Sequence, residues 1–157
     1  MEMPMPTESH KKLERLSGDW IGEEVMQPSP WAPQGSKATG RTTSRIALNG
    51  FVLIADYEQQ LGGQVTFTGH GVYTYSAEEQ CYALYWFDCM GGRPNIFKGS
   101  FEEDVLTLVS DESGAGGPRF SRTTYDLKIP GELKSRMEIS QDRKDWKLFM
   151  EAAYTRK

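Results

Sequence analysis

The sequence predicts an all-β protein, an antiparallel up-and-down barrel of about ten strands that follows one short helix. From Asp19 onward, apolar and polar residues alternate with a period of two, and β-branched and aromatic residues recur between Gly, Pro, Asn and Asp. The breaks between these runs are short enough for hairpins. A meander of this kind must stack as two sheets or close on itself. Closure removes the exposed edges, so we expect a barrel.

The helix is expected at residues 7–17. Thr7 can cap its first turn, Leu13 and Leu16 share one face, and Gly18 can end it in the left-handed conformation. The strands that follow are expected near residues 19–27, 36–48, 51–61, 64–76, 80–89, 93–101, 104–110, 118–128, 132–141 and 146–156.

Most of the connections have hairpin chemistry, such as Asn49-Gly50, Gly62-Gly63 and Pro130-Gly131. Two are different: residues 28–35 carry three prolines and Trp31, and residues 113–118 hold three glycines. These two loops could border an opening of the barrel, or they could be mobile surface loops.

Length and charge restrict the function. A chain of 157 residues favours one domain, so we expect a flexible N-terminus at residues 1–6 and a single barrel domain at residues 7–157. A net charge of −4 without a basic cluster gives no sign of a nucleic-acid partner. No apolar run is long enough for a membrane span, and residues 1–16 lack an apolar signal core. We therefore expect a soluble, cytoplasmic protein without a membrane partner.

The two cysteines support this compartment. Cys81 and Cys89 fall at opposite ends of one expected strand, beyond the reach of a disulfide, and free thiols fit a reducing cytosol. Neither has a second cysteine, a histidine or an acidic cluster at ligand spacing, so no metal site is expected.

A family resemblance begins at the helix. The segment Leu13-x-x-Leu16-x-Gly18-Asp19-Trp20-x-Gly22 resembles the start of calycins, the superfamily of lipocalins and fatty-acid-binding proteins. This resemblance implies that Trp20 packs across the closed end of the barrel, beneath a cavity. Further motifs are similar to the bacterial family called domain of unknown function 1579 over residues 10–157: Asn49-Gly50-Phe51-Val52-Leu53, Gly69-His70-Gly71-Val72-Tyr73, Tyr85-Trp86-Phe87-Asp88, Gly99-Ser100-Phe101 and Glu151-Ala152-Ala153-Tyr154-Thr155-Arg156.

That resemblance implies a calycin-like barrel without an established activity. A related haem-binding group, the nitrobindins, has a similar glycine–tryptophan start but takes its iron ligand from a histidine late in the chain. Here no histidine follows His70, so we expect no haem and no other cofactor.

A ligand site is expected on the inner face of the barrel. Asp88 follows Tyr82, Leu84 and Trp86 on one face, which would place a carboxylate in or at the mouth of the cavity. Arg122 could provide the opposite charge to Asp88. Fatty-acid-binding proteins hold a carboxylate ligand with a similar set of Arg and Tyr residues. Alternatively, Asp88 and Arg122 form an ion pair without a ligand. The expected ligand-binding residues are Tyr57, Phe67, Tyr73, Trp86, Asp88, Arg122 and Tyr154.

The sequence contains no clear catalytic motif. Alternation places His70 on the outer face, although a bulge at its glycine neighbours could turn it inward toward Asp88 as a general base. Glu23 and Glu24 are adjacent, so in a strand they point to opposite faces and are not a glycosidase pair. No nucleophile elbow, phosphate loop or dinucleotide motif is present.

The segment 81–87 is apolar or aromatic on both faces, which the outside of a barrel does not require. A second subunit could bury Tyr85 and Phe87 in a homodimer, or Trp31 and its loop could fold over them.

Three functions therefore remain open. The leading hypothesis is a non-catalytic barrel that binds a small, partly apolar or carboxylate ligand. The second is a small-molecule enzyme that uses Asp88, His70 and Arg122. The third is a structural or interaction protein that works through segment 81–87.

Overall fold

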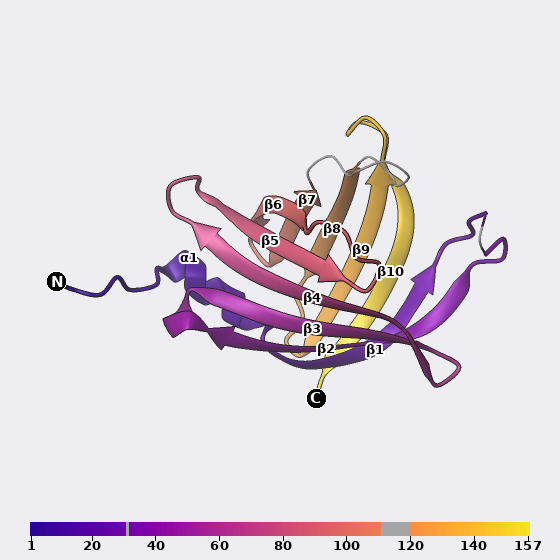
Figure 1. Cartoon of the computed structure of the whole chain (residues 1–157), viewed down its shortest axis with the longest axis horizontal. Coiled ribbons are helices and arrows are strands. Elements are labelled where there is room, and N and C mark those ends of the chain that lie inside the picture. Colours follow the sequence, from indigo (N-terminus) through magenta and orange to yellow (C-terminus); the bar gives the residue numbers. More distant parts are fainter. Residues whose placement is uncertain (31, 111–119) are drawn as a thin grey trace.

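The computed structural model describes residues 1–30, 32–110 and 120–157. Within them it confirms the predicted fold: a short N-terminal helix and ten antiparallel strands in a closed barrel, in the order β1-β10-β9-β8-β7-β6-β5-β4-β3-β2 (Figure 1). The strands are β1 Gly18–Met26, β2 Ser36–Ala47, β3 Val52–Leu61, β4 Gln64–Ser76, β5 Cys81–Asp88, β6 Asn95–Glu102, β7 Val105–Ser110, β8 Phe120–Asp126, β9 Glu132–Ser140 and β10 Lys147–Arg156.

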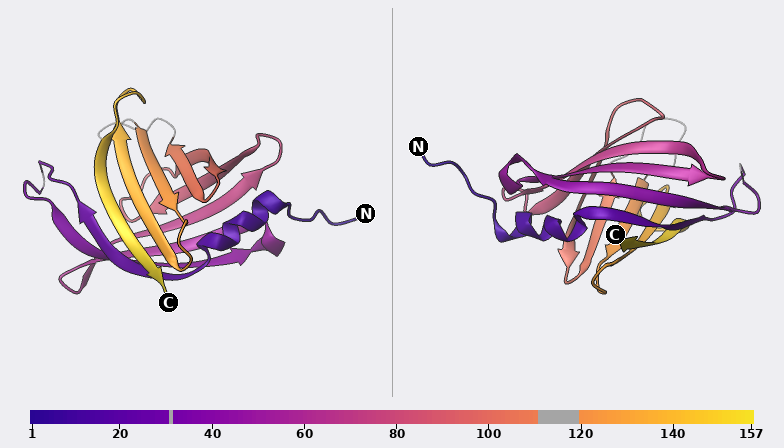
Figure 2. Two further views of the ribbon diagram at one scale, coloured as in Figure 1. Left: turned by 180° about the vertical axis from the view of Figure 1, so that it is seen from behind. Right: turned by 90° about the horizontal axis from the view of Figure 1, so that it is seen from below.

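Each of these strands matches an expected one to within two residues at the ends that the structure describes. The first residues of the expected strand 118–128, the loop 113–118 and Trp31 lie outside the described residues. Every strand pairs with its neighbours in sequence, and β1 also pairs with β10 to close the barrel (Figure 2).

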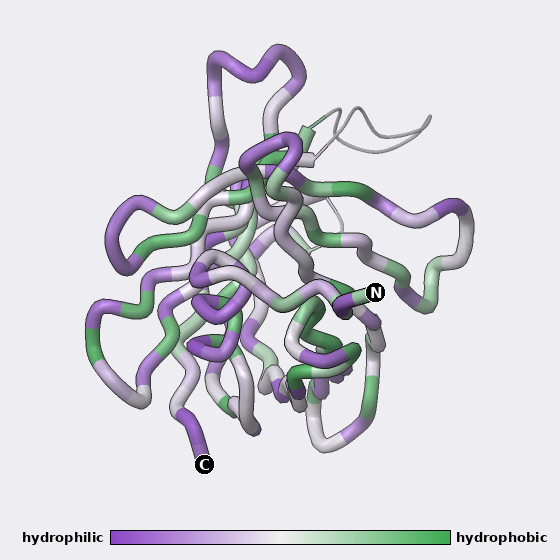
Figure 3. The backbone as a smooth tube through the Cα atoms, turned by 90° about the vertical axis from the view of Figure 1, so that its left-hand side faces the viewer, coloured by the Kyte–Doolittle hydropathy of each residue, from purple (hydrophilic) through white to green (hydrophobic). Residues whose placement is uncertain are grey.

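The helical segment covers one end of the barrel (Figure 3). It is shorter and tighter than expected: one α-helical turn, α1 (Glu8–Lys11), continues as a 3-10 helix, η1 (Lys12–Leu16). A second 3-10 turn, η2 (Leu48–Gly50), joins β2 to β3. Because side chains three residues apart eclipse in a 3-10 helix, Leu13 and Leu16 both enter the end of the barrel, where both are buried.

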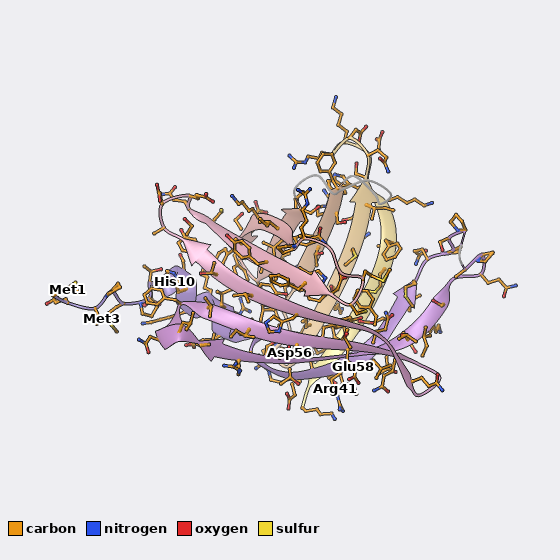
Figure 4. The ribbon with its side chains drawn as sticks, in the orientation of Figure 1. Met1, Met3, His10, Arg41, Asp56 and Glu58 are labelled. Carbon is orange, nitrogen blue, oxygen red and sulfur yellow. The ribbon has the colours of Figure 1, made fainter. Side chains whose placement is uncertain are left out.

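His10 anchors the first turn. Its Nδ1 accepts the backbone N–H of Thr7 at 3.1 Å, and the Thr7 hydroxyl accepts the backbone N–H of His10 at 3.4 Å, which is a reciprocal cap. The buried imidazole meets the rings of Phe51 and Tyr75 edge-on, at 5.1 and 5.5 Å between centroids. Figure 4 labels His10 on α1, whereas Met1 and Met3 extend away from the barrel. No helix among the described residues is both long and apolar enough to cross a membrane.

Candidate functional site

The barrel encloses a cavity of about 440 Å³. Its walls are the inward residues of the strands, spaced two apart along each, and its floor is Trp20 with Leu16 from η1. The Trp20 indole N–H donates to the carbonyl of Leu16 at 3.0 Å, and the Arg156 guanidinium stacks on its ring at 4.6 Å. The tryptophan is therefore held both by the helical segment and by the last strand.

One wall of the cavity is aromatic. The Tyr57 ring lies 6.1 Å from the Trp86 ring and 6.2 Å from the Phe67 ring. Two glycines of β4 make room for the indole: a Cβ on Gly69 would lie 2.1 Å from the Trp86 ring, and one on Gly71 would lie 3.2 Å from it. The indole therefore lies flat along the wall instead of filling the lumen, which is a physical reason for the Gly69-His70-Gly71 sequence.

The main polar centre of the cavity is Glu24, whose side chain is fully buried. Its carboxylate accepts the Tyr57 hydroxyl at 2.7 Å, the Gln59 amide at 2.9 Å and the Tyr154 hydroxyl. Gly40 on the neighbouring strand β2 lies against this carboxylate, and a Cβ there would come within 2.1 Å of a carboxylate oxygen. The glycine thus provides the space that the carboxylate occupies.

The donors of this Glu24 network are neutral. Burial, followed by the neighbouring Glu24 charge, raises the pKa of Tyr57 and of Tyr154 far above the ordinary value of a tyrosine, so both hydroxyls keep their protons. Hydrogen bonds from these three neutral side chains offset the cost of burying the carboxylate. None of the described basic residues forms an ion pair with Glu24.

Tyr73 and Tyr125 form a separate polar pair in the cavity lining. The Tyr73 and Tyr125 hydroxyls are 2.8 Å apart, and burial raises the pKa of both. Tyr73 and Tyr125 both line the cavity, so the aromatic walls carry a small number of fixed hydroxyl groups. Such groups could orient a ligand whose bulk is apolar.

Asp88 is the second acid in the lining. It is the last residue of β5, and its two carboxylate oxygens accept the Trp86 indole N–H and the Met90 backbone N–H, each at 3.0 Å. Its register partner on β4 is Gly69, which has no side chain to cover it. The carboxylate therefore lies half-buried beside the indole.

A family model described as "Protein of unknown function (DUF1579)" matches residues 5–156. The chain belongs to this family. A search of curated proteins gives no match. Among solved structures, the chain is similar to the crystal structure of Rv2717c from M. tuberculosis, with a TM-score of 0.75 and 14% identity over 98% of this chain and 99% of that one. This likeness concerns the fold.

The DUF1579 barrel brings six of the seven expected ligand-binding residues to its cavity, and Trp20 lies at the floor. The six are Tyr57, Phe67, Tyr73, Trp86, Asp88 and Tyr154.

Arg122 requires a correction. It lies on the outer face of β8, where its guanidinium donates to Glu138 at 3.0 and 3.1 Å and stacks on Trp146 at 4.3 Å. The inward residues of β8 are Ser121, Thr123 and Tyr125. The expected pairing of Arg122 with Asp88 is therefore wrong, because alternation along a strand turns every residue in phase with 122 away from the lumen.

His70 lies on the outer face, as alternation predicts. Its Nδ1 is 2.6 Å from a carboxylate oxygen of Asp56, which Figure 4 labels on β3, and both side chains are exposed. His70, Arg122 and Asp88 are thus not brought together, and the enzyme hypothesis has no assembled site in the described part of the chain. That part also holds no cluster of three His, Cys, Asp or Glu residues suited to a metal ion.

Glu24 is the charged residue of the described lining that the sequence interpretation does not place in the cavity. Its adjacency to Glu23 draws attention only to a possible pair of catalytic acids. The signal was nevertheless present: Trp20, Gly22 and Glu24 are spaced two apart, so a strand that begins with an inward Trp20 also turns Glu24 inward.

Proposed function

We propose that this DUF1579 protein is a non-catalytic barrel that binds a small, partly apolar molecule in its interior. The observation that carries the proposal is the cavity of about 440 Å³, a volume in the range typical of small-molecule sites. Its walls are mostly apolar and aromatic, and a few fixed polar groups converge on it, which is the usual composition of such sites. The free Cys81 and Cys89 fit the cytoplasmic location that forms part of the proposal.

Uptake of a neutral apolar fluorophore, N-phenylnaphthylamine, is the direct test. We expect saturable binding, and we expect Gly69→Ala to weaken it by at least about fivefold, because the new Cβ forces the Trp86 indole into the lumen. Fluorescence titration measures the affinity, and native mass spectrometry of gently purified protein detects a retained ligand. Asp56→Asn, on the outer face, serves as a control and should bind like the wild type. Absence of uptake by the folded wild type would refute the proposal.

We propose as a second function that the outer face of segment 81–87 forms a homodimer interface. Tyr85 and Phe87 are 39% and 48% exposed. Tyr85 belongs to a row of apolar residues that are paired across four neighbouring strands. The row consists of Ile54, Val72, Tyr85 and Ile96. Continuous apolar rows on an outer face are typical of interaction surfaces.

The dimer has its own test. The double variant Tyr85→Glu, Phe87→Glu should run as a monomer in size-exclusion chromatography while the wild type runs as a dimer, because two carboxylates would be buried without partners. The pair Thr66→Glu, Thr68→Glu, on the outer face of β4, is the control for added charge. A wild-type protein that runs as a monomer at all concentrations contradicts the proposal.

A further inference from the structure

The charged side chains that line the cavity have one sign among the described residues. Glu24 and Asp88 are the ionisable acids of the lining, and no Lys, Arg or His is among the described residues that line it. The one arginine expected there, Arg122, is outside and paired with Glu138. An anionic ligand would therefore have to enter beside two carboxylates without a described cation to receive it, at a high desolvation cost.

The Asp88 carboxylate can form a direct ion pair with a positively charged ligand. Among the described residues, Trp86 and Met90 each donate one hydrogen bond to a different oxygen of Asp88, and a carboxylate oxygen has room for a second. Both of these donors are neutral, so they orient the Asp88 carboxylate without cancelling its charge. None of the described basic residues forms an ion pair with it.

The aromatic wall beside Asp88 favours a cation as well. The faces of Trp86, Tyr57 and Phe67 carry the negative part of the ring quadrupole, and tryptophan attracts cations most strongly. Because Gly69 and Gly71 let the indole lie along the wall, one of its faces is turned to the lumen. The Tyr57 hydroxyl also donates a hydrogen bond to Glu24, so the deeper carboxylate adds negative potential behind the same ring.

We infer that the ligand is an organic cation, an amine with an apolar or aromatic body, whose ammonium group lies between the Asp88 carboxylate and the Trp86 and Tyr57 rings while its body fills the cavity above Trp20. This inference rests on the proposed binding function and names its ligand class. It replaces the carboxylate ligand that the expected Arg122 would have required.

Three probes with the same body and different head groups test the inference: phenylbutylamine, phenylbutanol and phenylbutyrate, titrated by calorimetry at neutral pH. The amine should bind about tenfold more tightly than the alcohol, and the carboxylate should bind most weakly. Asp88→Asn should remove most of the preference for the amine over the alcohol, because the charge that attracts the ammonium group is gone. Asp56→Asn removes the same charge from the outer face and should preserve the preference.

The outcomes separate the two proposals. If the alcohol binds as tightly as the amine, or if the carboxylate binds best, the inference of a cation is overturned while the binding function stands. If neither the three probes nor N-phenylnaphthylamine binds the folded wild type, the binding function itself fails. The ranking of probes on the wild type decides the matter even if Asp88→Asn does not fold.

Discussion

Replacement of Glu24 by leucine is expected to lower the free energy of unfolding by about 3 to 5 kcal/mol. The substitution removes the acceptor shared by Tyr57, Gln59 and Tyr154 and leaves the two tyrosine hydroxyls without it inside the barrel. Each orphaned buried donor costs about 1 to 3 kcal/mol. Urea denaturation followed by tryptophan fluorescence measures the loss.

Two further variants isolate the cause. Glu23→Leu changes the neighbouring residue, whose side chain is 64% exposed on the outer face, and should alter stability by less than about 0.5 kcal/mol. Adding Tyr57→Phe and Tyr154→Phe to Glu24→Leu should recover part of the loss, because both orphaned hydroxyls are then gone. If Glu24→Leu is as stable as Glu23→Leu, the hydrogen-bond network does not stabilise the fold.

Gly22→Ala is expected to destabilise the barrel by about 3 kcal/mol or more. A Cβ at residue 22 would lie 1.9 Å from the backbone oxygen of Ala153 and 2.7 Å from the Cα of Tyr154. Both atoms belong to the backbone, so β10 would have to move away from β1. That movement would also draw the Tyr154 hydroxyl from Glu24.

The matched control is Gly92→Ala. Gly92 has a positive φ of 83° and open space around its Cβ position, so alanine there costs only conformational strain, about 1 kcal/mol. The comparison separates the clash with β10 from the general effect of replacing a glycine. Equal unfolding midpoints for the two variants would contradict the prediction, because they would show that β10 can move away from β1 at little cost in stability.

The strands could be predicted because alternation and turn chemistry are local. The same period places Tyr57, Trp86 and Asp88 inward, and the cavity confirms that placement. The prediction from alternation failed at Arg122 because β8 is polar on both faces, so its sequence does not show which face is turned to the lumen. Residues 122 and 125 are three apart, so a regular strand turns only one of them toward the lumen, and that residue is Tyr125.

The Glu24 network was beyond the reach of such reasoning for another reason. Its partners lie 33, 35 and 130 residues away in the chain. Parity alone turns Glu24 inward, but only the register of the closed barrel shows which hydroxyls meet its carboxylate. Gly40 leaves space for the carboxylate, but a glycine in the sequence does not indicate which side chain occupies that space.

The pairing of β1 with β10 also bears on how the protein is made. Residues 18–26 leave the ribosome before their partner, residues 147–156, and the strands β2 to β9 are made in between. Throughout that interval β1 presents a free edge that can pair with a second nascent chain, and the Glu24 carboxylate lacks its Tyr154 donor. This edge is therefore protected only once residues 147–156 have been made and paired with it.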